Sequence, residues 1–430
     1  MKHLLLIFAA FSSLLLLAFA STEAATEEAT DDFFSAISPN NNSIPFHNFT
    51  NLEVAKADVE RYILGFKNEI NIPAFLFAMS VRGKTVMKKA WGTADLENNL
   101  PANVNNMFRI GSISKSFTSA LVGRLVDQGQ LHYEDLVSKY LDSAHFPPKS
   151  FNGHPVNITL GQLLSHTAGI PSEADGMFQQ INPPENVTQM ITRFRDSVQL
   201  YAAPGSGRFQ YSNVGYQLLG AVIESVTGKS FQENLNHFLK HEAKLPSAVN
   251  WDASTVLHNV PRYYSGVSIQ DNLRPGRGIV GAKPRGATFP STPIDELIFL
   301  NGWWPAGGIV ATLDDLLRWG HLLIDAYHGR PGAILSKKTI NEIWSPHAEV
   351  TGLPIFTQNS SYGYAFFVSR HNQVNQFVVF HSGGILGVSA QLTIFPDREI
   401  VGVTFSNKGA ILQKEQMVLY AAANLYHLVK

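Results

Sequence analysis

The sequence predicts a mixed α+β (or α/β) fold, in which strands from both ends of the chain form one antiparallel sheet that is flanked by helices. A mainly helical lobe is inserted between the two groups of strands. Strand-like apolar runs occur early, at residues 75–91, and late, at residues 364–405. Between them, apolar residues recur at helical spacing. The chain has 430 residues with 45% hydrophobic content, and above ~250–300 residues a single core usually divides into lobes.

The first 20 residues predict a secretory signal peptide. Lys2 precedes an apolar run over residues 4–17, and Ala18-Phe19-Ala20 resembles a cleavage site. A mitochondrial presequence is the alternative, but the segment lacks Arg and is not amphipathic. Residues 21–51 are acidic and then rich in Asn, Ser and Pro, which predicts a mobile leader. The folded domain should then cover residues 52–430, with the helical lobe at about residues 130–330.

The composition excludes several classes of protein. Net charge is −1, from 33 basic and 34 acidic residues, and no basic run is present that would bind nucleic acid or an anionic membrane. The absence of Cys rules out disulfides, thiolate metal sites and a cysteine nucleophile. No apolar run is long enough for a membrane span. Candidate N-glycosylation sites, which would fit a secreted surface, are Asn41, Asn48, Asn157, Asn186 and Asn359.

The N-terminal part of the domain predicts a helix followed by a hairpin. Apolar positions at residues 54, 59, 62, 63 and 66 have helical spacing, so a helix is expected over residues 52–66. Two strand-like runs, residues 75–81 and 84–91, flank Arg82-Gly83, which is typical of a hairpin turn.

The strongest chemical signal lies in residues 107–129, where an extended apolar entry turns at a Gly into a helix. Ser112 and Lys115 are three residues apart, and on a helix such positions lie about 5–6 Å apart at Cβ. Ser112 and Ser114 are candidate helix caps, and Gly129 is a helix stop. The positive end of the helix favours an oxyanion and disfavours the ammonium form of Lys115. The pattern therefore predicts a serine nucleophile with a neighbouring lysine base.

The middle of the chain predicts further helices. They are expected within residues 156–171, at residues 190–200 and at residues 214–226, and a Pro-Gly turn at residues 203–210 precedes Tyr211 and Asn213. His166 invites a catalytic interpretation, but a packing role in a loop is favoured, because no nucleophile or metal ligand lies near it in the sequence.

Residues 250–305 are rich in Pro, Gly and aromatic residues, and long irregular segments of this kind often form walls or lids of sites. Trp303 and Trp304 could line a pocket, although a core role is favoured beside a Gly-Gly turn. Thr312 and Asp315 form a predicted capping box for a helix that runs to Ala326.

The C-terminal part returns to strands and then ends in a helix. Strands are expected at residues 364–369, 377–380, 388–395 and 400–405, and the helix at residues 413–428. The site is expected between the sheet and the helical lobe.

Three motifs in this order resemble the serine beta-lactamase-like superfamily. They are Ser112-x-x-Lys115, Tyr211-x-Asn213 and His381-Ser382-Gly383. Further similarity lies in residues 163–169, in Pro204-Gly205 and in residues 306–317. The match covers nearly everything from residue 52 onward, and its nearest branch is that of class C beta-lactamases and D-alanyl carboxypeptidases. Among eukaryotes, the chain resembles the beta-lactamase-like proteins of animal mitochondria.

The resemblance implies a beta-lactamase/transpeptidase-like fold and roles for individual residues. Ser112 would be the acylated nucleophile, Lys115 its proton acceptor and Tyr211 a proton carrier to the leaving group. Asn213, His381, Ser382 and Gly383 would contact the substrate, and the N–H groups of Ser112 and Gly384 would form the oxyanion hole. His381 stands where beta-lactamases usually have Lys. Since His is mostly neutral at pH 7, a substrate carboxylate should be held more weakly.

The resulting hypothesis is a secreted serine hydrolase that cleaves an ester or amide without metal or cofactor. The substrate would be a small ester, amide or peptide. An acyltransferase would use the same residues and differ only in the acceptor. A protein that acts mainly in assembly or binding is a third hypothesis, because fold resemblance alone does not establish chemistry and mitochondrial relatives form filaments. A homo-oligomer is therefore also open.

Overall fold

A computed structural model describes residues 47, 49–174, 184–251, 257–265, 289–290, 304–350, 360–370, 376–385, 387–409 and 414–429. Several expectations fall outside these residues. They are the signal peptide, most of the leader and of residues 250–305, Trp303, and the glycosylation candidates Asn41, Asn48 and Asn359. Of the other two candidates, Asn157 is exposed and Asn186 is half-buried.

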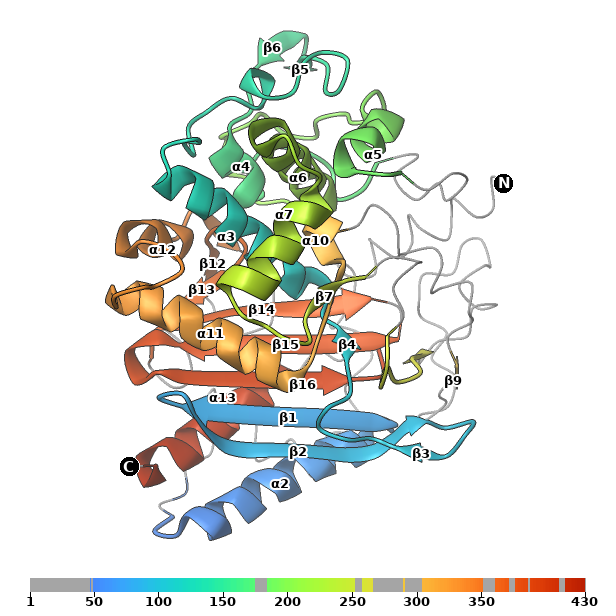
Figure 1. Cartoon of the computed structure of the whole chain (residues 1–430), viewed down its shortest axis with the longest axis vertical. Helices are drawn as coiled ribbons and strands as arrows, with labels where there is room; N and C mark the ends of the chain where they lie inside the picture. Colours follow the sequence, from blue (N-terminus) through green and yellow to red (C-terminus); the bar gives the residue numbers. More distant parts are fainter. Residues whose placement is uncertain are drawn as a thin grey trace.

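The predicted α+β fold with an antiparallel sheet is confirmed (Figure 1). The main sheet has the strand order β11-β12-β13-β14-β15-β16-β1-β2-β3. Its strands are β1 (Ala74–Val81), β2 (Lys84–Asp95), β3 (Leu100–Pro101), β11 (Ala348–Val350), β12 (Ser360–Tyr362), β13 (Phe367–Ser369), β14 (Val378–Ile385), β15 (Val388–Phe395) and β16 (Ile400–Ser406). The N-terminal hairpin joins the C-terminal strands through antiparallel pairing of β1 with β16, in the register Phe75↔Ser406 to Val81↔Ile400.

The central strands of the sheet are buried on both faces. On one face lie α2 (Leu52–Glu69) and α13 (Lys414–Leu425), and their apolar side chains share a cluster with Phe75, Phe77 and Met79 of β1. The alternate residues Leu76 and Ala78 belong to the cluster on the other face, where α11 (Leu313–His328) and the helical lobe pack. Strand residues alternate between faces, so coverage of both faces explains why all of β1 is apolar or buried.

The helical lobe follows the hairpin in the sequence. Its helices are α3 (Ser114–Asp127), α4 (Leu160–Leu164), α5 (Val187–Phe194), α6 (Asn213–Thr227), α7 (Phe231–His237) and α10 (Trp304–Gly307), and α12 (Lys337–Ile343) packs on α11 and α3. A small sheet with the order β4-β10-β7 comprises β4 (Phe108–Arg109), β10 (Ile309–Ala311) and β7 (Val249–Asn250). Two short hairpins pair β5 (Lys149–Phe151) with β6 (His154–Val156), and β8 (Tyr264–Ser265) with β9 (Phe289–Pro290).

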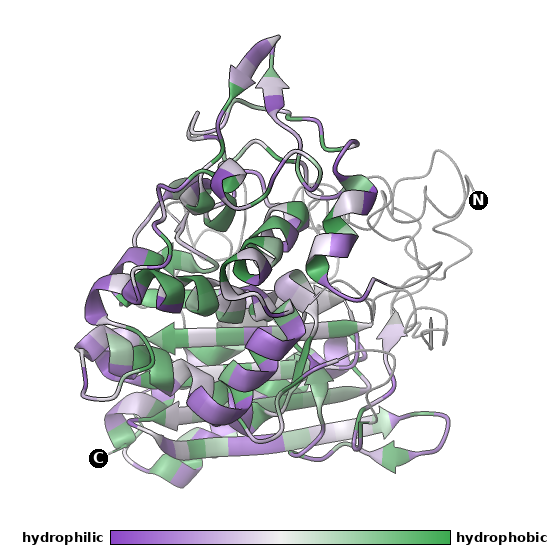
Figure 2. Cartoon of the chain, turned by 45° about the horizontal axis from the view of Figure 1, so that its top comes forward, coloured by the Kyte–Doolittle hydropathy of each residue, from purple (hydrophilic) through white to green (hydrophobic). Residues whose placement is uncertain are grey.

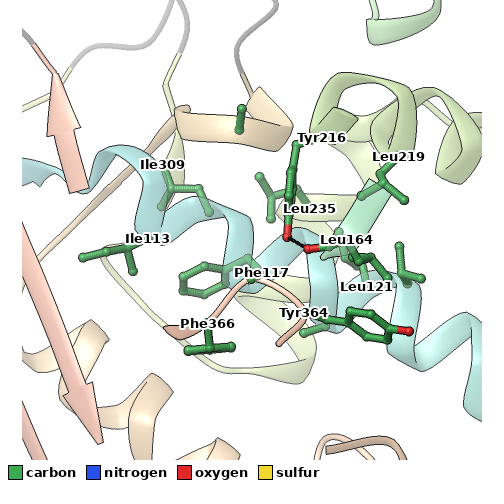
Figure 3. Close-up of a cluster of buried hydrophobic side chains, with 14 of the residues drawn as sticks. Ile113, Phe117, Leu121, Leu164, Tyr216, Leu219, Leu235, Ile309, Tyr364 and Phe366 are labelled. Carbon is green, nitrogen blue, oxygen red and sulfur yellow. Dashed lines mark hydrogen bonds between the residues drawn. The ribbon is translucent and has the colours of Figure 1, made fainter. Parts of the chain in front are cut away.

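Helix α3 lies in the middle of the hydrophobic cluster on the lobe side of the sheet (Figure 3). Phe117 stacks on Trp319 of α11 with ring centroids 4.2 Å apart, and Leu121 lies among residues from α4, α6 and α7. Eleven of its fourteen residues are buried, including Ser114 and Lys115. Figure 2 shows the hydrophobic residues along the central strands and the helices above them. Because α3 is packed on all sides, the residues at its N-terminus have a fixed position.

Several elements differ from their expected bounds. The helix expected at residues 190–200 is α5, which begins earlier because the Asn186 side chain accepts the Gln189 N–H and caps it. Strand β14 extends to Ile385, beyond the expected end at residue 380, because β15 pairs with it through the third motif and the following Gly384. Helices α7 and α12 were not expected. None of the helices in the described parts of the chain is long and apolar enough to cross a membrane.

Candidate active site

The nucleophile turn begins at Gly111, ahead of helix α3. Residues Gly111–Ile113 form a 3-10 turn, and α3 begins at Ser114. Neither expected cap is formed: the N-cap position is Ile113, without a side-chain bond, and the Ser114 hydroxyl instead accepts the Ile309 N–H at 3.2 Å. Ser114 thus links the turn to β10. The two residues in this contact are 195 positions apart in the sequence.

Lys115 is fully buried, and its Nζ atom contacts three oxygen atoms. It lies 3.1 Å from Ser112 Oγ, 2.7 Å from Asn213 Oδ1 and 2.9 Å from the carbonyl oxygen of Ala306. Burial lowers the pKa of Lys115 to about 7, although the negative charge of Glu173 acts in the opposite direction. A substantial fraction of Lys115 is therefore the neutral amine near neutral pH.

The identity of these three oxygen atoms defines what Lys115 can do. The Asn213 amide oxygen and the Ala306 carbonyl can only accept hydrogen bonds, whereas the Ser112 hydroxyl can also donate. A neutral amine has two N–H donors and one lone pair. When both donors are used by the acceptor-only oxygens, the lone pair is left for the Ser112 hydroxyl. This is the geometry of a general base beside its nucleophile.

Tyr211 lies beside the same pair. Lys115 Nζ is 4.8 Å from the centroid of its ring. Burial raises the pKa of Tyr211, the Ser112 hydroxyl lowers it, and the Glu173 charge raises it further. The phenol is therefore protonated at neutral pH. Its hydroxyl is near Ser112, but it completes no hydrogen bond of regular geometry with the described residues.

Asn213 connects Lys115 to a carboxylate that sequence reasoning missed. Its Nδ2 donates to Glu173 Oε1 at 2.6 Å, while its Oδ1 faces Lys115. Glu173 is only half-buried as a residue, but its Oε2 atom is buried and has no hydrogen-bond partner in the described structure. Burial raises the pKa of Glu173 to about 8, opposed by the Asn213 hydrogen bond and the Lys115 charge. In the sequence, the signal that could have pointed to Glu173 was its position as an acidic residue four positions after Gly169.

His166 holds the turn that carries Tyr211. Its carbonyl accepts the Gln210 N–H at 2.9 Å, and its Nδ1 accepts the Ser212 N–H at 3.1 Å. Because a backbone N–H only donates, Nδ1 is unprotonated. Burial, with the charges of Lys115 and His381, lowers the pKa of His166 well below its usual value. The expectation of a packing role agrees with this contact set, although the residue packs directly against Tyr211, with ring centroids 4.4 Å apart.

The third motif approaches the nucleophile turn through its backbone. A Cβ atom on Gly383 would lie 1.8 Å from the Ile110 carbonyl oxygen, and one on Gly111 would lie 2.9 Å from the Gly384 nitrogen. Real Cβ atoms do not approach so closely, so both positions need glycine, and Gly111 also has φ +50°. The structure thus places Gly384 beside the turn that carries Ser112, as an oxyanion hole would require.

His381 is buried in the protein and is not exposed to solvent. It is 1% exposed, and its ring nitrogens lie 2.6 Å from the Ser382 carbonyl oxygen and 3.1 Å from the Tyr362 hydroxyl. Since a carbonyl only accepts, Nδ1 carries a proton and the other nitrogen accepts from Tyr362 in the neutral ring. A substrate carboxylate would have to displace one of these contacts.

A pocket in the described part of the structure lies away from these residues. It has a volume of about 610 Å³ and is lined by residues 105, 107, 246–247, 257–259, 312, 314–315 and 318. None of the residues around Ser112 lines it. Its polar groups are used elsewhere: Asp315 caps α11 and Arg318 donates to the Ala243 carbonyl. We therefore place the candidate chemistry at Ser112.

Comparison with known proteins supports one family. A family model described as Beta-lactamase matches residues 59–426. The human mitochondrial serine beta-lactamase-like protein LACTB is 24% identical, and the match covers 80% of this chain and 72% of that protein. Among solved structures, an octameric penicillin-binding protein homologue from Pyrococcus abyssi has a TM-score of 0.67 at 24% identity and covers 86% of this chain and 76% of its own. EstCE1, described as a hydrolase with promiscuous acyltransferase activity, has a TM-score of 0.68 at 21% identity, covering 87% and 99%.

Proposed function

The chain belongs to the beta-lactamase family, and from this premise we propose that it is a serine hydrolase that cleaves an ester or amide through an acyl-enzyme on Ser112. The observation that carries the proposal is the contact set of Lys115. Two acceptor-only oxygens take its N–H donors, so its lone pair is directed to the Ser112 hydroxyl. Burial also lowers the pKa of Lys115 to about 7, which provides the neutral amine that a general base requires.

The reaction follows from these positions. Ser112 Oγ attacks the carbonyl carbon of the substrate while its proton moves to Lys115 Nζ. The N–H groups of Ser112 and Gly384 stabilise the oxyanion. The bond to the leaving alkoxide or amine then breaks, and the leaving group takes up a proton through Tyr211, which regains one from Lys115. Water attacks the acyl-enzyme in the reverse sense, releases the acid and restores Ser112. Asn213, Ser382 and Gly383 would contact the acyl group.

Labelling tests the proposal directly. A fluorophosphonate probe, which phosphonylates an activated serine, should label the wild-type protein and leave Ser112→Ala unlabelled. Ser138→Ala is a matched control, because Ser138 is exposed and lies outside the site. Equal labelling of wild type and Ser112→Ala would contradict the proposal. A panel of p-nitrophenyl esters, D-aminoacyl amides and beta-lactams would then define the substrate class.

Transfer to an alcohol or amine is an alternative fate of the same acyl-enzyme. The description of EstCE1 as an acyltransferase as well as a hydrolase favours testing it. Adding a small alcohol during ester turnover would divert acyl groups into a new ester if transfer competes with hydrolysis. The product ratio, measured by chromatography, separates the two.

Location and assembly are separate parts of the proposal. We propose a secreted protein, with a mitochondrial location as the alternative that the similarity to LACTB favours. Expression of the full chain with a C-terminal fluorescent tag distinguishes them. The octameric homologue favours a test for homo-oligomers, by sizing chromatography at several concentrations. A large assembly without Ser112-dependent turnover would favour an assembly role over catalysis.

A further inference from the structure

The Glu173 carboxylate contacts the Asn213 amide on the side opposite to Lys115. The chain of contacts runs from Glu173 Oε1 to Asn213 Nδ2 at 2.6 Å, and from Asn213 Oδ1 to Lys115 Nζ at 2.7 Å. A further 3.1 Å separates Lys115 Nζ from Ser112 Oγ. Two residues, Asn213 and Lys115, thus connect Glu173 with the nucleophile.

The orientation of the Asn213 amide decides where the Lys115 lone pair points. With Oδ1 toward Lys115, the amine donates to it and keeps its lone pair for Ser112. With the amide turned over, Nδ2 would face the amine and donate to that lone pair, so Ser112 would lose its proton acceptor. The two orientations differ little in shape. The Oε1 atom of Glu173, which accepts from Nδ2 at 2.6 Å, selects the first.

We propose that Glu173 is a positioning residue for acylation, which fixes the Asn213 amide so that the lone pair of Lys115 is directed to the Ser112 hydroxyl. This proposal rests on the function proposed above. It also assigns Asn213 to the base rather than to the substrate alone, because Oδ1 and one Nδ2 hydrogen are already bonded within the protein.

Glu173 has a second effect through its charge. Its negative charge raises the pKa of Lys115, against the larger effect of burial. Because burial raises the pKa of Glu173 itself to about 8, this charge is only partly formed near pH 7 and the two groups titrate together. Removal of the charge should still lower the pKa of Lys115, so the acidic limb of the rate profile, which follows formation of the neutral amine, should move to lower pH. A residue that only supports the fold would change stability without moving this limb.

Other groups that face Lys115 must be considered in such a profile. The rings of Tyr211 and Tyr216 lie 4.8 and 5.4 Å from its Nζ atom, and burial raises the pKa of both. His166 carries a pKa well below its usual value, and His381 acts on His166 from β14. The tyrosines and His166 thus stay neutral between about pH 6 and 8. His381→Asn in the wild-type background provides the control for the remaining group.

The test compares three variants by the rate at which the fluorophosphonate phosphonylates Ser112 between pH 5 and 9. Glu173→Leu, which cannot accept from Asn213, should react at least about tenfold more slowly than wild type at pH 8. Glu173→Gln keeps an acceptor oxygen, so its plateau rate should fall less. Its acidic limb should move to lower pH, as expected for loss of a partly formed negative charge nearby. Glu349→Gln, an exposed residue on β11, is the matched control.

A complementary pair sharpens the test. Asn213→Asp places two carboxyl groups in contact, and adding Glu173→Gln restores a donor–acceptor pair, so the double variant should acylate faster than Asn213→Asp alone. If wild type is labelled at Ser112 but the limb is unmoved and the double variant shows no rescue, the positioning role is wrong. An effect confined to KM for cationic substrates would also overturn it, since Glu173 would then bind substrate. If wild type shows no Ser112-dependent labelling, both proposals fail.

Discussion

The two walls on either side of Ser112 are built in different ways. One, the sheet wall, consists of the turn at residues 110–112 and the β14 glycines Gly383 and Gly384, and it is held by backbone atoms in close contact. The other, the lobe wall, consists of His166, Glu173, Tyr211 and Asn213, and it is held by buried polar side chains. Lys115 lies between them.

This difference separates shape from protonation. In the sheet wall a Cβ atom at Gly111 or Gly383 would collide with backbone atoms, so these two glycines determine where the oxyanion donors lie. In the lobe wall, Asn213 accepts a hydrogen bond from Lys115, the Glu173 charge raises its pKa, and the Tyr211 ring lies against its amine. Substitutions in the two walls should therefore be distinguishable by measuring activity and stability together.

The largest effect is expected for Lys115→Met, which removes the base. Turnover of an ester should fall by about 10²–10⁴-fold. Stability should rise, because a lysine whose pKa is lowered to about 7 in the folded protein binds its proton more readily when unfolded. The gain should be about 1–4 kcal/mol near pH 7, and it should shrink as the pH rises toward about 10, where the unfolded lysine also loses its proton.

Urea unfolding at pH 7 and pH 9.5 measures this gain. If Lys115→Met is less stable than wild type at pH 7, the lysine contributes more through its hydrogen bonds than its burial costs. The expectation that Lys115 supports catalysis but lowers stability would then be wrong.

Gly383→Ala should lose both activity and stability, in contrast to Lys115→Met. The new Cβ would lie 1.8 Å from the Ile110 carbonyl oxygen, so β14 must move away from the nucleophile turn. Overpacking of this kind costs about 1–3 kcal/mol. Loss of one oxyanion donor lowers kcat by about 10²–10³-fold.

Gly215→Ala is the matched control for this variant, because a Cβ there would meet its nearest atoms at 3.6 Å, an ordinary contact. Thermal unfolding and ester kcat should both remain close to wild type in the control. Full activity in Gly383→Ala would mean that the sheet wall does not place the oxyanion donors.

A smaller effect is expected for His166→Asn in the lobe wall. Asparagine tolerates the φ of +59° at this position but cannot reproduce the imidazole acceptor for the Ser212 N–H. Looser positioning of Tyr211 should lower kcat by about tenfold, as for loss of one hydrogen bond worth about 1–1.5 kcal/mol. The ratio of mutant to wild-type rates should be constant from about pH 6 to 8, because the pKa of His166 lies well below its usual value.

A ratio that varies through pH 6.5 would show that His166 titrates during turnover. It would then act as an acid or base itself, and the lobe wall would contain a second proton carrier.

The smallest effect concerns His381 and substrate charge. From the sequence, a charged His381 near pH 5.5 should hold the carboxylate of penicillin more strongly. The kcat/KM for penicillin should then rise relative to that for an uncharged ester. The structure changes this expectation, since the ring is buried and both nitrogens are hydrogen-bonded within the protein. We expect the ester-to-penicillin ratio of kcat/KM to change less than about threefold between pH 7.5 and 5.5.

Measuring the same ratio in His381→Lys tests the alternative, because division of the two rates cancels most loss of general-base function. A tenfold fall in the ester-to-penicillin ratio of wild type between pH 7.5 and 5.5 would show that the imidazolium reaches the substrate carboxylate.

The sequence by itself determined the elements whose signals are local. The spacing of Ser112 and Lys115 requires one face of a helix, and the observed contact of 3.1 Å follows from it. Apolar runs located the strands at both ends of the chain, and the order of the three motifs indicated the family. These features depend on residues within a few positions of one another, or on patterns that the chain carries whatever its fold.

Tertiary structure alone decided the features that join distant segments. Glu173 meets Asn213 from 40 residues away, and the Ala306 carbonyl reaches Lys115 across 191 residues. The burial of His381 and the extension of β14 depend on β15 and Tyr362. A pKa or a buried hydrogen bond depends on what surrounds a group in space, because desolvation and nearby charges act over a few ångströms regardless of sequence separation.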